Sequence, residues 1–206
     1  RQHNPKGFIF ANIGAGHSLE NAQKAVEMLS ADALEIHINT GQELVMKDSE
    51  GDRSFYWLEN INRIAEKLDV PVVVKEVGFG MSQKMFKQLS QTAVAGINVG
   101  GKGGTNFAWI ESGRGHSTLD LDDFGFTGPE SLIEAQFAQN IKPLIATGGI
   151  ASARDILHAQ LLGAPLASSA GHILSILNAQ GSQAVDEMFR QWKDDLIKLY
   201  TLVGAR

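Results

Sequence analysis

Residues 70–75 read Val-Pro-Val-Val-Val-Lys, an apolar run that ends in a single lysine. Polar residues do not alternate with the apolar ones, as they do in a strand that has one face in water. Such a run is typical of a parallel strand buried on both faces, and parallel strands need long crossover connections, which are usually helical. The stretch therefore predicts an α/β domain with helices on either side of this strand.

The sequence around this strand alternates between strand-like and helix-like segments. Strands are expected at residues 8–13, 33–39, 70–75, 96–99, 143–146 and 165–169. Helices are expected at residues 19–30, 55–68, 82–92, 129–140 and 152–162, and two more helices follow the last strand. This succession of βα units predicts a parallel sheet with right-handed crossovers.

Glycines follow several of the expected strands, at positions 78 and 80, 100 and 101, 148 and 149, and 171. An open doubly wound sheet would concentrate such signals at one switch point, whereas a barrel arranges the ends of all its strands around one site. We therefore expect a TIM (β/α)8 barrel that forms a single domain over residues 1–206. About six of the eight βα units are recognisable, and we expect the other two to be N-terminal to them.

Composition excludes several classes of function. The chain has 206 residues, a formal net charge of −5 and no cysteine. An acidic chain is not typical of a general nucleic-acid binder, and the absence of thiols excludes disulfides and thiolate metal ligands. No apolar stretch is long enough to span a bilayer. We therefore expect a cytoplasmic protein with neither a nucleic-acid nor a membrane partner.

A polar cluster follows the second expected strand. Residues 34–43 read LEIHINTGQE, in which apolar and polar side chains alternate until the strand opens into a loop. His37, Asn39, Gln42 and Glu43 should lie together at the end of this strand. An imidazole, two amides and a carboxylate could hold a metal-bound anion, or they could form a hydrogen-bond network inside a barrel.

Two late glycine turns indicate a phosphate site. Gly148 and Gly149 follow the fifth expected strand, and Ala170 and Gly171 follow the sixth. Glycine lets backbone N–H groups approach an anion, and the loops after the last two strands of a barrel commonly bind phosphate. Simple tight turns are the alternative. The denser glycine loop at residues 100–104 could wrap around a cofactor edge, although it is not a P-loop.

Lys75 ends the apolar strand, so its ammonium group should point into the mouth of the barrel. There it could be a functional group, or it could form an ion pair with Glu76 or Glu35.

Charged loops are expected at residues 47–53 and around Asp120, Asp122 and Asp123. The amphipathic helix near the C-terminus should pack on the barrel wall or form a subunit interface.

Three motifs together resemble type 2 isopentenyl-diphosphate isomerase: HINTGQE at residues 37–43, VKEVGFG at 74–80 and GGKGGTNF at 100–107. The resemblance extends from residue 8 to residue 206. The family has a TIM-barrel fold, binds FMN and forms homo-oligomers, here expected to be a tetramer or an octamer. It interconverts isopentenyl and dimethylallyl diphosphate with reduced FMN as acid and base, Mg²⁺ and NADPH. The family's N-terminal Arg-Lys substrate contacts have no counterpart in this sequence.

The resemblance also implies roles for individual residues. The implied FMN contacts are Asn12, Lys75, Gly100 and Thr105, with Gly148, Gly149, Ala170 and Gly171 around the phosphate. The implied substrate-binding residues are His37, Asn39, Gln42 and Glu111. Glu43 would ligate Mg²⁺, and Gln42 and Lys75 would be catalytic.

Two other readings stay open. One is an FMN-dependent oxidoreductase of the 2-hydroxy acid oxidase type, which should carry a catalytic histidine in its glycine-rich loop, whereas residues 100–104 read Gly-Gly-Lys-Gly-Gly. An enzyme like IMP dehydrogenase would need a cysteine, and the chain has none. The other is a flavin- or phosphate-binding protein without catalysis, in which Gln42 and Glu43 could change without loss of function.

Overall fold

A computed structural model describes residues 5–46, 54, 57–114, 119 and 121–205. These residues form a parallel six-stranded sheet in the order β1-β2-β3-β4-β5-β6. The strands are β1 (Phe10–Gly14), β2 (Ala33–Ile38), β3 (Val72–Glu76), β4 (Gly96–Asn98), β5 (Leu144–Ala146) and β6 (Leu166–Ala167). Because every strand pairs with its neighbours in sequence, the sheet has the strand order of a barrel and no reversal of the doubly wound kind.

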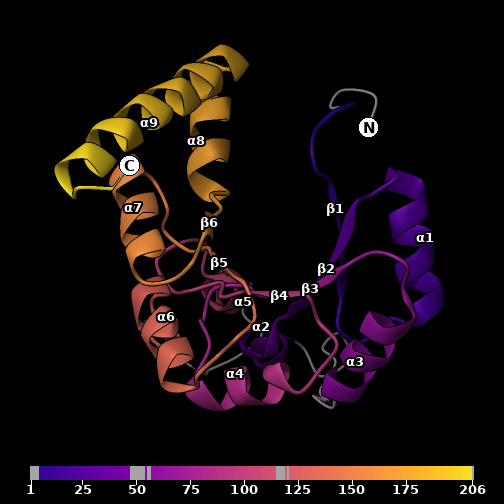
Figure 1. Ribbon diagram of the computed structural model, residues 1–206. Coiled ribbons are helices and arrows are strands. Elements are labelled where there is room, and N and C mark those ends of the chain that lie inside the picture. Colours follow the sequence, from indigo (N-terminus) through magenta and orange to yellow (C-terminus); the bar gives the residue numbers. More distant parts are fainter. Residues whose placement is uncertain (1–4, 47–53, 55–56, 115–118, 120, 206) are drawn as a thin grey trace.

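The sheet is an incomplete barrel. Its strands follow an open arc, with α1, α3, α4, α6 and α7 along the outer side (Figure 1). The helices are α1 (Leu19–Leu29), α2 (Thr40–Val45), α3 (Trp57–Lys67), α4 (Gln83–Ser90), α5 (Phe107–Gly113), α6 (Gly128–Phe137), α7 (Ala153–Leu161), α8 (Gly171–Gln180) and α9 (Ser182–Leu202). The expected partial TIM barrel is thus confirmed. In the described part of the chain, no helix is long and apolar enough to cross a membrane.

Strand β3 is buried on both faces, as its composition predicts. Val74 lies in register with Ile36 of β2 and Ile97 of β4, and all three side chains are fully buried. They belong to the main hydrophobic core, whereas the alternate position Lys75 lines a cavity. The sheet therefore has an apolar face against the helices and a polar inner face where its strands end.

The expected helix after residue 128 begins as its sequence suggests. The Thr127 side chain accepts a hydrogen bond from the Glu130 backbone N–H, and the Glu130 carboxylate accepts one from the Thr127 N–H. This capping box, with Pro129 in the first turn, fixes the N-terminus of α6. The other expected helices agree within a few residues, and residues 47–53, 55–56 and 120 lie outside the described part of the chain.

Two short helices correct the sequence analysis. Gln42 and Glu43 were expected in a loop but lie on α2, and α5 occupies another segment expected to be a loop. Helices this short are unstable alone, so packing must hold them. Val45 of α2, Phe79 and Ala108 of α5 form a second buried cluster. A Cβ atom at Gly41 would lie 2.5 Å from the Phe79 ring, so only glycine lets α2 approach this closely.

Helix α9 packs on the barrel wall. It lies against α7 and α8 (Figure 1), its Trp192 ring stacks on His172 with centroids 5.9 Å apart, and the Tyr200 hydroxyl donates to Gln160 of α7. This is the first of the two expected arrangements. Ile197 and Leu202 of α9 remain exposed.

The loop between β3 and α4 is organised by one buried carboxylate. Oxygen Oε2 of Glu76 accepts hydrogen bonds from the backbone N–H groups of Gly78, Phe79 and Gly80, at 2.7, 2.6 and 3.1 Å. Burial raises the pKa of the Glu76 carboxyl to about 7, although these hydrogen bonds act in the opposite direction. Glu76 therefore positions Phe79, the side chain on which α2 rests.

Because its pKa is raised on folding, Glu76 should make the stability depend on pH. The folded state binds the Glu76 proton more tightly than the unfolded state does. Protonation of Glu76 therefore stabilises the folded protein, and this contribution is fully present below about pH 4.5 and is lost as the pH rises through about 7. The free energy of unfolding should fall by about 3 kcal/mol across this window. Urea denaturation at pH 5 to 8.5 would measure the fall, and Glu76→Gln should remove most of it. Parallel pH profiles for the two proteins would contradict the assignment.

Candidate functional site

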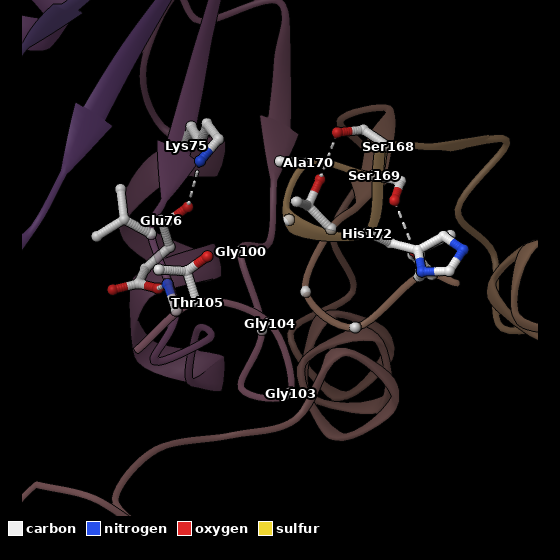
Figure 2. A pocket seen from close by; sticks show the side chains of 18 of the residues that line it. Lys75, Glu76, Gly100, Gly103, Gly104, Thr105, Ser168, Ser169, Ala170 and His172 are labelled. Atoms are coloured by element: carbon white, nitrogen blue, oxygen red, sulfur yellow. Dashed lines mark hydrogen bonds between the residues drawn. The ribbon is translucent and has the colours of Figure 1, made fainter. Parts of the chain in front are cut away.

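A cavity of about 430 Å³ lies at the carboxyl ends of β3 to β6. Its lining comes from the turns after these strands, and Figure 2 shows Lys75 and Thr105 across the cavity from Ser168 and Ala170. Its volume is within the range of small-molecule sites. In a barrel, this end of the strands is where ligands bind.

Seven of the eight predicted cofactor residues line this cavity. They are Lys75, Gly100, Thr105, Gly148, Gly149, Ala170 and Gly171. The eighth, Asn12, lies instead on β1, where its Oδ1 atom is 2.9 Å from Nδ1 of His37. The structure thus brings together the residues predicted from distant parts of the chain, and their contacts with FMN stay a prediction.

Main chain forms much of the cavity wall. Gly148 has a φ of +105°, and a Cβ atom there would overlap the carbonyl oxygen of Gly101. Gly100 has a φ of +49°, and its Cβ would overlap the carbonyl oxygen of Glu76. The glycine turns therefore pack backbone against backbone and leave space and N–H groups for a ligand. A cavity wall built from these glycine turns fits a flat ring system that carries a phosphate.

Three hydroxyl groups in the cavity lining escaped the sequence analysis. Thr147 Oγ1 donates to Ser168 Oγ at 3.1 Å, and Ser169 Oγ donates to the carbonyl of Ile150 at 2.7 Å (Figure 2). These bonds tie the turn after β5 to the turn after β6. The sequence signal that could have identified these hydroxyl groups is the presence of small polar residues directly after the last two strands.

Lys75 does not form the ion pair that was considered for it. Its Nζ donates to the backbone carbonyl of Glu76 at 3.2 Å, as Figure 2 shows. The Glu76 carboxylate is occupied by the loop N–H groups, and Glu35 accepts from Asn98 Nδ2 at 2.8 Å. The ammonium group of Lys75 is therefore held at the cavity wall without a carboxylate partner in these contacts.

A second cavity of about 340 Å³ lies beside the first. It is lined by the loop after β1, by His37, Asn39 and Glu43, and by Trp57 of α3. The two cavities are neighbours, because His37, which lines the second, pairs in register with Lys75, which lines the first. Burial lowers the pKa of His37, the charges of Lys75 and His17 lower it further, and Glu43 acts in the opposite direction.

The remaining predicted residues form one hydrogen-bond network. Asn39 Nδ2 donates to Glu43 Oε1 at 2.7 Å and lies 3.5 Å from Gln42 Oε1. Gln42 Nε2 donates to Glu111 Oε1 at 3.2 Å, and Arg114 Nη1 donates to Glu111 Oε2 at 2.9 Å. Glu111 is only 6% exposed. The network fixes the Gln42 carboxamide between α2 and α5.

The smaller cavity offers a metal ion one carboxylate, that of Glu43. Among the described residues, no cluster of three or more His, Cys, Asp or Glu side chains could hold a metal ion. Mg²⁺ often binds through one or two carboxylates together with water and substrate phosphates. A single carboxylate at Glu43 is compatible with that arrangement, and its role as a ligand stays a prediction.

Comparison with known proteins gives a consistent result. The sequence model of the FMN-dependent dehydrogenase family matches residues 11–206. An isopentenyl-diphosphate delta-isomerase of Lactococcus lactis subsp. lactis (strain IL1403) is 61% identical over 206 residues, and one of Limosilactobacillus reuteri (strain DSM 20016) is 47% identical over 208 residues. Each alignment covers 100% of this chain and 59% of the relative, so the chain spans less than two thirds of their length.

Solved structures agree on the fold. A mandelate oxidase variant with an FMN adduct matches with a TM-score of 0.70 and 18% identity, over 97% of this chain and 60% of that chain. A flavocytochrome b2 variant with sulfite bound matches with a TM-score of 0.71 and 19% identity, over 98% of this chain and 52% of that one. At this identity the likeness concerns the fold alone. The resemblance found in the sequence is confirmed by the curated relatives, and the chain belongs to the FMN-dependent dehydrogenase family.

Proposed function

We propose that the protein interconverts isopentenyl diphosphate and dimethylallyl diphosphate, with FMN, Mg²⁺ and NADPH as cofactors. The observation that carries the proposal is the network from Asn39 through Gln42 to Glu111, in which Asn39 and its partner Glu43 line the smaller cavity. The names of the curated relatives support it.

The larger cavity would hold FMN. The glycine turns after β5 and β6 would bind its phosphate through backbone N–H groups, and Lys75 and Thr105 would contact it from the opposite side. Bound reduced FMN would supply acid and base chemistry, and NADPH would serve to reduce it. The ammonium of Lys75, oriented by the Glu76 carbonyl, would favour negative charge at this place.

Substrate positioning would fall to the second cavity. His37 and Asn39 would bind the diphosphate, and Glu43 would hold it through Mg²⁺. Because Glu111 accepts from Gln42 Nε2, the Gln42 carboxamide has a fixed orientation, and we place it nearest the isoprenyl carbons. Such fixed contacts would lower the barrier by orienting the reacting carbons.

The fold alone does not choose between this reaction and hydroxy acid oxidation. An oxidase of that type is expected to carry a histidine in the glycine-rich loop, where this chain has Lys102. Lys102 Nζ donates to the carboxylate of Asp123 at 2.8 Å, so it ties the loop to the acidic segment. The lack of a histidine in this glycine-rich loop therefore supports the isomerase over the oxidase.

We further propose a cytoplasmic homo-oligomer, a tetramer or an octamer, without nucleic-acid or membrane partners. Apolar side chains on α8 and α9 support self-association, because Leu174, Ile197 and Leu202 are 56%, 58% and 81% exposed. The net charge of −5 supports the exclusion of nucleic acid.

An anaerobic assay of the full-length protein tests the proposed reaction. With FMN, NADPH, Mg²⁺ and isopentenyl diphosphate, we expect dimethylallyl diphosphate to form without stoichiometric loss of NADPH. Gln42→Ala and Glu43→Ala should each lower kcat/KM by about a hundredfold or more, because both act on a positioned substrate. Lys24→Gln on α1, where the side chain is 61% exposed and lines neither cavity, should leave the rate unchanged. Flavin-loaded protein that forms no product would refute the isomerase and direct attention to hydroxy acids as electron donors.

Flavin affinity should depend on the glycine at position 148. Gly148→Ala combines strain at positive φ with overlap of the Gly101 carbonyl, so we expect FMN to bind at least about tenfold more weakly. Gly163→Ala is the matched control, because Gly163 has a φ of +95° but no atom within 4 Å of its added Cβ. Quenching of flavin fluorescence on binding measures both. Equal affinities in the two variants would exclude the turn at Gly148 from the flavin site.

A further inference from the structure

We propose that His17, in the loop after β1, binds the substrate diphosphate together with His37. The inference rests on the proposed function for the identity of the substrate. It adds to the site a residue that the sequence motifs did not assign. The ligand class is a diphosphate ester or inorganic pyrophosphate in the cavity of about 340 Å³.

Both imidazoles border the same empty place. A Cβ atom at Gly14 would lie 3.3 Å from Nε2 of His37 and 3.6 Å from Cδ2 of His17. Gly14 lacks that atom, so the space between the two rings is open to the cavity. Because Nδ1 of His37 is engaged by Asn12 at 2.9 Å, its Nε2 atom is the one that faces this space.

The loop that carries His17 is fixed from two sides. Asn60 Nδ2 of α3 donates to the carbonyl oxygens of Ala15 and His17, at 2.8 and 2.9 Å. The Ala15 N–H donates to the carbonyl of His37 at 3.0 Å. Nδ1 of His17 lies 3.3 Å from Asn21 Nδ2, which leaves Nε2 as the free ring nitrogen. The imidazole is thus held at the rim of the cavity instead of moving with an unconstrained loop.

The chemistry of the lining favours a phosphate group. Among the described side chains around this cavity, His17 and His37 are the two imidazoles. Both can donate from a ring nitrogen to a phosphate oxygen, and charged partners make such bonds stronger and shorter. Glu43, which also lines this cavity, would repel a bare diphosphate but would hold one that carries Mg²⁺. The two histidines and the carboxylate therefore select a metal-bound diphosphate.

Binding of inorganic pyrophosphate to the full-length, FMN-loaded protein tests the site independently of turnover. Calorimetry with Mg²⁺ present should show that His17→Ala weakens binding about tenfold or more, since a charge-assisted hydrogen bond is lost. The KM for isopentenyl diphosphate should rise by the same factor, with kcat and FMN affinity changed less than about threefold. Lys24→Ala removes an exposed basic side chain of α1 that lies outside both cavities, and it should change none of these quantities.

The outcomes separate this proposal from the proposed function. Unchanged pyrophosphate affinity in His17→Ala would overturn the role of His17, even if the protein is an active isomerase. No pyrophosphate binding to the unmodified protein would overturn the site. Binding that depends on His17 in a protein without isomerase activity would support the site and refute the proposed reaction. A fall in FMN affinity or in Tm in His17→Ala would assign the residue a structural role and overturn the proposal.

Discussion

The parallel register between β2 and β3 is the constraint on which the site depends. It places His37 directly beside Lys75 and, one residue earlier, buries Ile36 beside Val74. The apolar pair anchors both strands in the core, so the polar pair next to it cannot move independently. One strand thus contributes to the smaller cavity and its neighbour to the larger one. The spacing of paired strands therefore sets how far the His37 side of the smaller cavity lies from the Lys75 side of the larger one.

Each strand then leads directly into a segment that completes the site. Strand β2 leads into α2 with Gln42 and Glu43, and β3 leads into the loop that Glu76 holds through three backbone hydrogen bonds. The Phe79 ring from that loop packs against α2 at Gly41. A buried carboxylate with a raised pKa is a costly way to shape a loop. Three backbone hydrogen bonds offset part of this cost, and the same loop positions the helix that carries Gln42 and Glu43.

Periodicity and glycine placement were sufficient to predict the strand succession, the partial barrel and the glycine turns of the larger cavity, whereas the place of Thr105 there was implied by the family resemblance. They could not predict α2 and α5, because six- and seven-residue helices are stabilised by packing against each other and Phe79 and not by local propensity. The contact between Gln42 and Glu111 joins residues 69 positions apart, which no local pattern encodes. The pairing of Asn12 with His37, away from the larger cavity, depends on strand register in the same way. His17 carries no motif, and only the folded loop brings it to His37.

In the proposed function, the larger cavity binds the flavin and the neighbouring smaller cavity binds the metal-bound diphosphate. A crystal structure of the full-length protein with oxidised FMN, Mg²⁺ and isopentenyl diphosphate tests it most directly. The account predicts the flavin against Lys75 and the glycine turn at Gly148, with the diphosphate between His37 and Glu43 and the isoprenyl carbons toward Gln42. A diphosphate bound elsewhere, with the cavity at His37 filled only by water, would contradict it.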